Sequence, residues 1–327
     1  MNHSRSALLF ICLVMIGGAS PAAAASTADT FPSKPIRFVV GFPPGGGNDL
    51  LARMVGQKLA DRTGRAVVID NRPGAGGNLA ADLVAKAPPD GYTILMISSS
   101  HPIQGLLKKS LPYDPIRDFA GVAQLVVYRS ILVVHPSVAA HSVRELIALA
   151  QSRPAQLMFV SSGNGAGSHL AGELFRIATK VDITHVPYKG TAQAVTDLLS
   201  GRVQMMFTPL LPVLQQLQAG RLRALAVTSR NRSRIMPELP TVEEAGVQGY
   251  EFVGWYGILA PAATPKAALR KLNAEVAQIV QSPDIKERIY AEDMDLVNAP
   301  PDQFDVVRKN ELAKWSRIVK QTGIHVE

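Results

Sequence analysis

Four segments of the chain combine a short apolar strand, a loop rich in glycine and other small residues, and a helix that begins in that loop. They read IRFVVGFPPGGGNDLLARMV (36–55), VVIDNRPGAGGNLAADLVA (67–85), LMFVSSGNGAGSHLAGELF (157–175) and ITHVPYKGTAQAVTDLL (183–199). The first N–H groups of a helix lack partners within the helix and carry the positive end of its dipole. Because a glycine loop lets a ligand approach those groups closely, each junction is a potential anion-binding site. Glycine and proline are also common in ordinary turns, so one junction alone carries little weight.

The junctions form two pairs, at 36–86 and 157–200. Each pair reads strand, glycine loop, helix, strand, second loop, helix. This weak internal repeat is typical of two similar α/β lobes that face each other.

Residues for other kinds of chemistry are sparse. The loop GNGAGS (163–168) is an imperfect match to a dinucleotide-binding fingerprint, with Asp182 at a distance suited to a ribose contact. The sequence contains no GxxxxGK[ST] phosphate loop, no GxSxG nucleophile elbow and no paired histidines or cysteines spaced for zinc. We therefore predict no catalytic residue, no metal site and no cofactor.

Three isolated polar residues lie near the junctions. His169 follows the third glycine loop and His185 precedes a proline, so either could donate a hydrogen bond to a carboxylate, although a lone histidine more often has a structural role. Lys189 could neutralise an anion. We interpret Trp255 and Trp315 as packing residues, with a ligand platform as the alternative for Trp255.

The first 25 residues have the features of a secretory signal peptide. Arg5 precedes an apolar run at 7–16, and the small residues PAAAA (21–25) provide a cleavage site, so we predict cleavage after Ala25 and export to the periplasm. The only cysteine, Cys12, lies inside this segment, so the mature chain is expected to contain no disulfide. The net charge of +8 comes from scattered lysines and arginines, which argues against a nucleic-acid partner.

The remaining residues, about 300, suffice for two domains. We expect strands alternating with helices, and an almost wholly helical C-terminal part from Pro265 onward, with helices at 266–281, 283–291 and 301–321. The chain passes between apolar strands without a helix near 128–131 and near 249–257, which suggests two crossings between lobes. The predicted lobes are 26–128 plus 251–327, and 129–250, able to close around a ligand. The predicted strands are 36–40, 66–69, 93–97, 125–127, 131–134, 157–160, 183–186, 203–207, 222–228 and 252–259.

The chain resembles the substrate-binding proteins of tripartite tricarboxylate transporters, the Bug family. The resemblance rests on eight segments in order: FPSKPI (31–36), PPGGGND (43–49), NRPGAGGN (71–78), LPYDP (111–115), SHLAGELF (168–175), HVPYKG (185–190), LRALAVT (222–228) and LPTVEEAG (239–246). It implies a two-lobed type II periplasmic-binding-protein ("Venus flytrap") fold without catalysis. It also implies a monomer in the periplasm that holds a small carboxylate and delivers it to membrane transporter subunits.

The resemblance also implies the positions that hold the ligand, which coincide largely with the glycine loops. Many relatives have Asp-Asn after the strand 203–207, whereas this chain has Thr208-Pro209. That difference argues against an amino-acid ligand and favours a simple mono- or dicarboxylate. The expected ligand-binding residues are Phe42, Gly45, Gly46, Gly47, Asn48, Asp49, Ala75, Gly76, Gly77, Ser98, Ser99, Ser162, Asn164, Gly165, Ser168, His169, Lys189, Gly190, Thr191 and Thr208.

Two other functions remain open at the level of the sequence. One is a receptor of the same fold that passes its signal to a sensor kinase. The other is an exported enzyme that uses the loop 163–168 to hold a cofactor.

Overall fold

The computed structural model describes residues 31–108 and 110–322, so the predicted signal peptide and Cys12 lie outside the described residues. The strands are β1 (Ile36–Val40), β2 (Val67–Asn71), β3 (Thr93–Ser98), β4 (Phe119–Arg129), β5 (Ile131–Val134), β6 (Met158–Ser161), β7 (Thr184–Pro187), β8 (Met205–Thr208), β9 (Arg223–Val227), β10 (Val253–Pro261) and β11 (Met294–Ala299). The α-helices are α1 (Gly47–Thr63), α2 (Asn78–Ala85), α3 (Gln104–Leu107), α4 (Val143–Ser152), α5 (Gly167–Thr179), α6 (Thr191–Leu199), α7 (Leu214–Gln218), α8 (Lys266–Gln281), α9 (Pro283–Ala291) and α10 (Pro301–Thr322). Short 3₁₀ helices lie at Ala75–Gly77, His101–Ile103 and Leu211–Val213.

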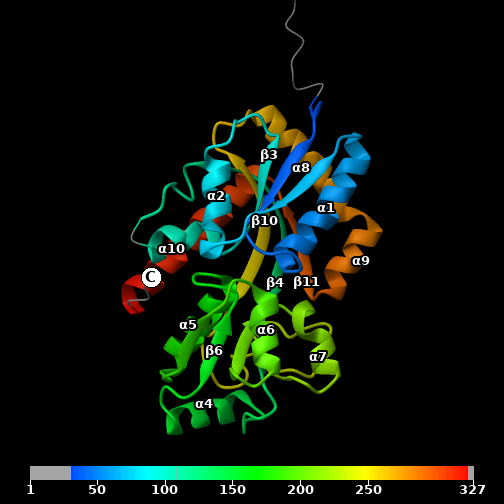
Figure 1. The fold of residues 1–327 in the computed structure, drawn as a ribbon. Helices are drawn as coiled ribbons and strands as arrows, with labels where there is room; N and C mark the ends of the chain where they lie inside the picture. Colours follow the sequence, from blue (N-terminus) through cyan, green and yellow to red (C-terminus); the bar gives the residue numbers. More distant parts are fainter. Residues whose placement is uncertain (1–30, 109, 323–327) are drawn as a thin grey trace, which may run out of the picture.

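The strands of the described residues form two sheets, one in each lobe (Figure 1). The first lobe contains a six-stranded sheet in the order β11-β4-β10-β3-β1-β2, in which β1 is parallel to β2 and β3 while β10 runs antiparallel to β3 and β4. The second lobe contains a five-stranded sheet in the order β7-β6-β8-β5-β9, in which β6 is parallel to β7 and β8. Since parallel strands end at the same edge of a sheet, the loops after β1 and β2 share one edge and those after β6 and β7 share another.

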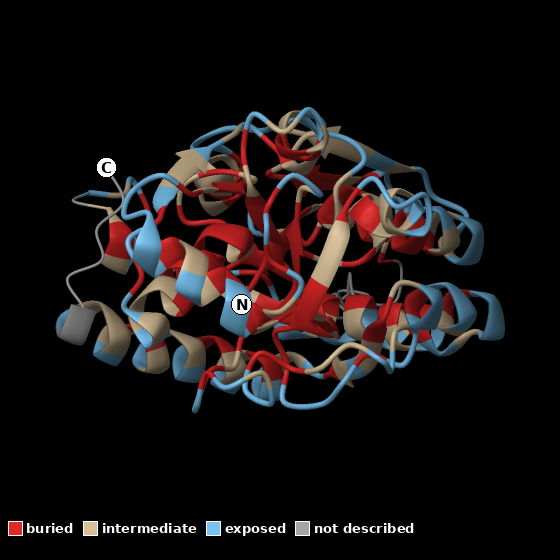
Figure 2. Ribbon diagram, turned by 90° about the horizontal axis from the view of Figure 1, so that it is seen from below, coloured by how far each residue is buried: buried red, intermediate tan, exposed pale blue. Residues whose placement is uncertain are grey.

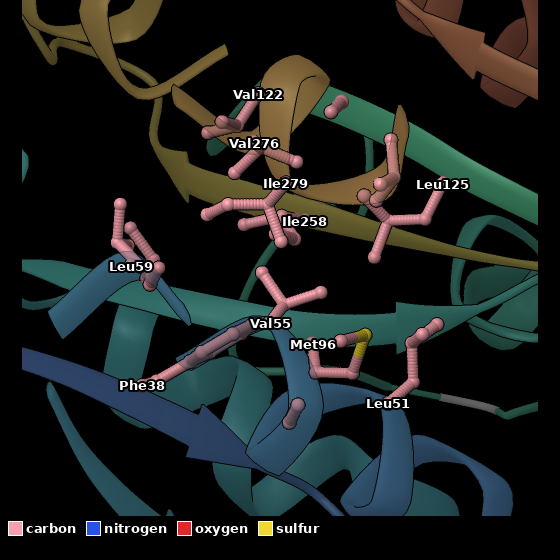
Figure 3. Packing of buried hydrophobic residues seen from close by; sticks show 14 of the residues in the cluster. Phe38, Leu51, Val55, Leu59, Met96, Val122, Leu125, Ile258, Val276 and Ile279 are labelled. Atoms are coloured by element: carbon pink, nitrogen blue, oxygen red, sulfur yellow. The ribbon is translucent and has the colours of Figure 1, made fainter. Parts of the chain in front are cut away.

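The core of the first lobe explains why α1 and α8 form where they do. Leu51, Val55 and Leu59 recur at helical spacing on one face of α1 and are at most 1% exposed. They pack in one cluster with Phe38 of β1 and Ile279 of α8 (Figure 3). Figure 2 shows buried residues throughout the interior and exposed residues on the outer turns of helices and loops.

The C-terminal helix α10 contributes to more than one core. Phe304, near its beginning, packs with Trp255 of the first sheet, their ring centroids 5.2 Å apart. Trp315, three turns further on, belongs to the cluster that surrounds Phe159 and Phe207 of the second sheet. The side chain of Glu311 lies between the two and accepts hydrogen bonds from the indole nitrogens of Trp255 and Trp315, at 3.4 and 2.8 Å. Both tryptophans are therefore packing residues, as the sequence suggested.

The chain crosses between the sheets at Ser130, between β4 and β5, and again in the segment that joins β9 to β10. The buried side chain of Thr228 holds these crossings together: its hydroxyl bonds the backbone of Ser130 and donates to the carbonyl of Phe252 at 2.7 Å. The crossings therefore lie side by side. The lobe limits at 128/129 and 250/251 stay a prediction.

Two expectations about the strands need correction. The C-terminal part is not almost wholly helical, because β11 pairs antiparallel with β4 between α9 and α10. Its sequence, MDLVNA, contains Asp and Asn, which are uncommon in strands, and it is stabilised as a sheet edge by pairing with β4 and by packing of Met294 in the core of the first lobe. The strand predicted at 125–127 extends over Phe119–Arg129, because it pairs with both β10 and β11.

Candidate functional site

The loop after β1 is held in shape by the buried carboxylate of Asp49. One carboxylate oxygen accepts hydrogen bonds from the backbone of Gly45 (2.9 Å) and from Arg53 (3.0 Å), and the other accepts one from Asn71 (2.8 Å). Burial acts to raise the pKa of Asp49, but these hydrogen bonds outweigh it and hold that pKa below its usual value. Asp49 and Arg53 thus pair with each other within the loop. The start of α1 is left without a capping side chain, because its N-cap is Gly46.

The loop after β6 is organised by Ser168 and His169, the second and third residues of α5. The hydroxyl of Ser168 accepts a hydrogen bond from the backbone of Ser162 (3.0 Å), and Nδ1 of His169 accepts one from the backbone of Gly165 (3.0 Å). The N-cap of α5, Ala166, also provides no capping side chain. In contrast, Ser142 caps α4, its hydroxyl accepting from the backbone of Glu145.

His169 and His185 form a stacked pair with ring centroids 3.9 Å apart. Burial lowers the pKa of His169 to about 4 and that of His185 to about 3, so both rings are neutral at physiological pH. The ring of His185 is bonded to the hydroxyl of Ser161 at 2.6 Å. Their partners show that the two histidines support the loop between β6 and α5.

The loops of the two lobes enclose a cavity, which we call the first compartment, with a volume of about 270 Å³. The starts of α1, α5 and α6 all border it, and its lining includes Tyr128 and Tyr256. The hydroxyl of Thr208 and the side-chain oxygen of Asn48 have no hydrogen-bond partner among the described residues, although both side chains are more than nine-tenths buried. Of the predicted site residues, the first compartment is lined by Phe42, Gly46, Gly47, Asn48, Ser98, Ser162, Ser168, Lys189, Gly190, Thr191 and Thr208.

A second compartment of about 470 Å³ adjoins the first. The two share five lining residues, Phe42, Pro43, Ser162, Lys189 and Gln193. The second compartment adds Lys108 and the predicted site residues Ala75, Gly76, Gly77 and Asn164. Among the described lining residues, Lys189 and Lys108 carry the positive charges. Neither lining contains Asp or Glu.

Five predicted residues line neither compartment: Gly45, Asp49, Ser99, Gly165 and His169. Asp49 and His169 face inward, where they accept backbone hydrogen bonds from Gly45 and Gly165. Asp49 and His169 thus determine the shape of their loops. A sequence motif alone does not distinguish that role from direct contact with a ligand.

The two glycine loops approach each other across the cavity. The amide of Gln104, in the first lobe, donates to the backbone carbonyl of Gly165 in the second at 3.2 Å. A Cβ atom on Gly76 would lie only 2.6 Å from the carbonyl oxygen of Asn164. The lobes are therefore in contact at the rim of the cavity in this structure.

Glycine is required at Gly47 more clearly than at Gly46. Gly46 has φ −84°, which any residue adopts, and the nearest atom to an added Cβ is 3.9 Å away. A Cβ on Gly47 would lie 2.5 Å from the hydroxyl oxygen of Tyr256. Gly165 has φ +74°, so a substitution there strains the backbone itself.

Sequence reasoning missed the two tyrosines of the first compartment. Tyr128 and Tyr256 lie on β4 and β10, at the predicted crossings, and a signal was available in the run Gly254-Trp255-Tyr256-Gly257. Because neighbouring residues on a strand point to opposite faces, Trp255 packs in the cluster that contains Phe304, while Tyr256 packs in the cluster on the other face and also lines the cavity. Sequence reasoning also missed Pro43, Pro44, Gln193, Met206, Pro209 and Pro212.

Within the described residues, no three His, Cys, Asp or Glu side chains come together as metal ligands would. None of the helices described in residues 31–108 and 110–322 combines the length and the apolar character needed to cross a membrane.

Comparison with known proteins identifies the class to which this cavity belongs. The family described as "Tripartite tricarboxylate transporter family receptor" matches residues 51–324. Protein BugT from Bordetella pertussis is 37% identical over 325 residues, which cover 99% of both chains. A solved structure of an R. palustris protein with adipate is similar with a TM-score of 0.87 and 36% identity, covering 90% of this chain and 99% of that one. MatC from Rhodopseudomonas palustris with bound malate has a TM-score of 0.84 and 29% identity, covering 88% and 100%.

These matches and the two-lobed fold correspond to a solute-binding receptor and not to an enzyme, so the cofactor-dependent alternative for the loop 163–168 is not supported. The chain belongs to the tripartite tricarboxylate transporter receptor family, the family of the Bug proteins.

Proposed function

We propose that this protein binds a small carboxylate in the first compartment and delivers it to the membrane subunits of a transporter. One observation carries the proposal: α1 from one lobe and α5 and α6 from the other begin at the same cavity without capping side chains. Helix N-termini favour a negative charge, and three of them would share it between both lobes. The side chain of Lys189 adds a positive charge, and the hydroxyl of Thr208 adds a hydrogen-bonding group.

The charges of the lining favour an acid without an amino group. An ammonium group inside the cavity would need a carboxylate partner, because burying an unpaired charge is costly. The described lining provides no carboxylate. The nearby Asp49 lies outside the lining and is bonded within its own loop. Thr208 and Pro209 stand where many proteins that this chain resembles have Asp-Asn, so this position provides no carboxylate either. We therefore favour a mono- or dicarboxylate over an amino acid.

The second compartment provides room for a longer acid. It is continuous with the first through shared residues such as Ser162 and Lys189, and Lys108 lies in its lining. A dicarboxylate could place one carboxylate at the helix starts and the other near these lysines. The relatives solved with adipate and malate hold dicarboxylates, which supports this choice.

A thermal-shift panel tests the ligand class. Succinate, malate and adipate should each be compared with aspartate, glutamate and a neutral sugar, because a ligand that binds only the folded state raises Tm by mass action. We expect Tm to rise with at least one plain acid and to stay unchanged with the amino acids and the sugar. Lys189→Ala should reduce the shift, whereas Lys309→Ala, which removes an exposed lysine on α10 outside both compartments, should not. A shift with aspartate alone would contradict the proposal.

Delivery and location need separate tests. Residues 1–25 are proposed to be removed on export, so protein isolated from the periplasm should begin at Ser26 by intact mass. A strain that lacks the gene should lose uptake of the bound acid, and the wild-type gene should restore it. Uptake that continues without the gene would mean that binding serves another purpose, such as signalling through a sensor kinase.

A further inference from the structure

Two tyrosines line the first compartment from the strands that lead to the crossings between lobes. Tyr128 is the penultimate residue of β4, and Tyr256 lies on β10, its antiparallel neighbour. Their rings stack with centroids 4.6 Å apart, and both side chains are only 5% exposed. Gly254, opposite Tyr128 in the register, makes room for this arrangement, because a Cβ there would overlap the Tyr128 ring.

The two hydroxyls lie against helix starts that belong to different lobes. A Cβ atom on Gly47, the first residue of α1, would be 2.5 Å from the hydroxyl oxygen of Tyr256. A Cβ atom on Gly167, the first residue of α5, would be 2.9 Å from that of Tyr128. Because neither glycine carries a side chain, each hydroxyl reaches the place where the N–H groups of that helix are exposed.

Both hydroxyls keep their protons at physiological pH. Burial raises the pKa of Tyr128 to about 12, with the neighbouring side chains of Ser99 and Tyr256 acting against the rise. Burial also raises the pKa of Tyr256 well above its ordinary value. A protonated phenol can donate a hydrogen bond to a carboxylate, and a buried donor discriminates strongly against ligands that cannot accept it.

We propose that Tyr128 and Tyr256 are ligand-binding residues, whose hydroxyls position a carboxylate between the start of α1 and the start of α5. This inference rests on the proposed function, since it takes the anion to lie in the first compartment. Tyr128 belongs to the first lobe but contacts the first residue of α5 in the second. Because the Tyr128 hydroxyl lies against α5 in this arrangement of the lobes, a carboxylate held there would contact groups of both lobes and stabilise this arrangement.

Removal of single hydroxyl groups tests this proposal without disturbing the stacked rings. The variants are Tyr128→Phe, Tyr256→Phe and the double variant. Tyr250→Phe is the matched control, because Tyr250 is also buried but its hydroxyl donates to the backbone carbonyl of Ala171 at 3.0 Å, outside both compartments. Calorimetric titration with succinate, malate and adipate measures Kd, thermal unfolding of the free proteins checks the fold, and small-angle scattering measures closure.

We expect each single cavity variant to bind the preferred acid about ten-fold more weakly, which is the loss of one hydrogen bond to a charged partner. The double variant should bind more weakly still and should show less compaction at the same acid concentration, with Tm of the free protein little changed. Tyr250→Phe should keep the wild-type Kd. Wild-type affinity in both single variants, or an equal loss in Tyr250→Phe, would overturn the inference while leaving the receptor function intact. A wild-type protein that binds none of the three acids would instead overturn the proposed function, and this inference with it.

Discussion

At the scale of single residues, the structure separates the groups that shape the loops from the groups that line the cavity. Asp49 and Arg53 bond each other and the loop before α1, and His169 bonds the loop before α5. Gly47 and Thr208 line the first compartment directly, and Ser168 both bonds the loop after β6 and lines the compartment. Apart from Thr208, which follows the strand 203–207, the sequence placed these residues at the glycine junctions, but their roles differ.

The first prediction distinguishes binding by the helix start from binding by an arginine. Gly47→Val places side-chain atoms where the Tyr256 hydroxyl lies, so we expect the affinity for the preferred acid to fall at least ten-fold, about 1.4 kcal/mol. Arg53→Ala should keep its affinity within a few-fold, because Arg53 does not line either compartment. Calorimetric titration measures both. Binding lost in Arg53→Ala and retained in Gly47→Val would mean that a guanidinium holds the acid.

The second prediction concerns the stability of the free protein in acid. The pKa of His169 falls from 6.5 to about 4 and that of His185 from 6.5 to about 3 on folding, both mainly through burial. Between pH 6.5 and these values the unfolded chain binds protons that the folded chain does not, so the free energy of unfolding decreases as the pH is lowered. The decrease is at most about 1.4 kcal/mol per pH unit for each such histidine.

Urea unfolding at several pH values between 7 and 4 measures this slope. His185→Asn should reduce the slope, and His141→Asn, which removes an exposed histidine, should leave it unchanged. A slope that is the same in all three proteins would contradict the assignment of the effect to the stacked pair.

At the scale of elements, α10 does more than cover the first sheet. Phe304, in its first turn, packs against Trp255 of the first sheet, and Trp315 reaches the core of the second sheet. Burial acts to raise the pKa of Glu311, against the influence of Lys314 and of the hydrogen bonds from Trp315 and Trp255. Through Phe304 and Trp315, α10 packs against both lobes, and Figure 1 shows it at the side of the molecule.

The third prediction follows from this packing. Trp315 is 1% exposed, so Trp315→Ala should lower the free energy of unfolding by about 3–5 kcal/mol, the usual cost of deleting a large buried aromatic side chain. Val306→Ala on the same helix should change it little, because Val306 is 55% exposed. Denaturant titration gives both values. An equal effect of the two substitutions would show that Trp315 does not belong to the core.

At the scale of the whole molecule, the arrangement of the lobes depends on a few connections. Thr228 holds the crossings together, and an ionic network lies near them. Arg129 of β4 contacts Asp293 at 2.7 Å and Asp295 at 2.5 Å, and Arg234, in the segment after β9, contacts Asp295 at 2.7 Å. The network joins the end of the first sheet to a segment that follows the second.

The fourth prediction is closure on binding. A ligand favours the closed form only by the contacts that it makes with both lobes in that form. Small-angle scattering should therefore give a smaller radius of gyration with saturating acid than without it. At an acid concentration near the wild-type Kd, Gly47→Val should show a smaller change than the wild-type protein. An unchanged radius in the wild-type protein would contradict hinge closure.

The sequence by itself determined the alternation of strands and helices, the four glycine junctions and the residues around them. These features depend on local properties: apolar periodicity, the conformational freedom of glycine and the unpaired N–H groups at helix starts. The resemblance to the family followed from the same motifs. For this reason the positions of β1, α1, β6 and α5 agree with the structure. Most of the predicted ligand-binding residues line one of the two compartments, and their contact with a ligand stays a prediction.

Only the tertiary structure decided which groups face the cavity. Asp49 and His169 turn inward because partners from the loop, the helix and a neighbouring strand are within bonding distance, and Tyr128 and Tyr256 line the cavity because two antiparallel strands meet beneath it. The edge strand β11 exists because β4 is beside it, and Trp315 belongs to the second core because α10 extends that far. These outcomes depend on contacts between residues far apart in the chain, which a local pattern of residues does not specify.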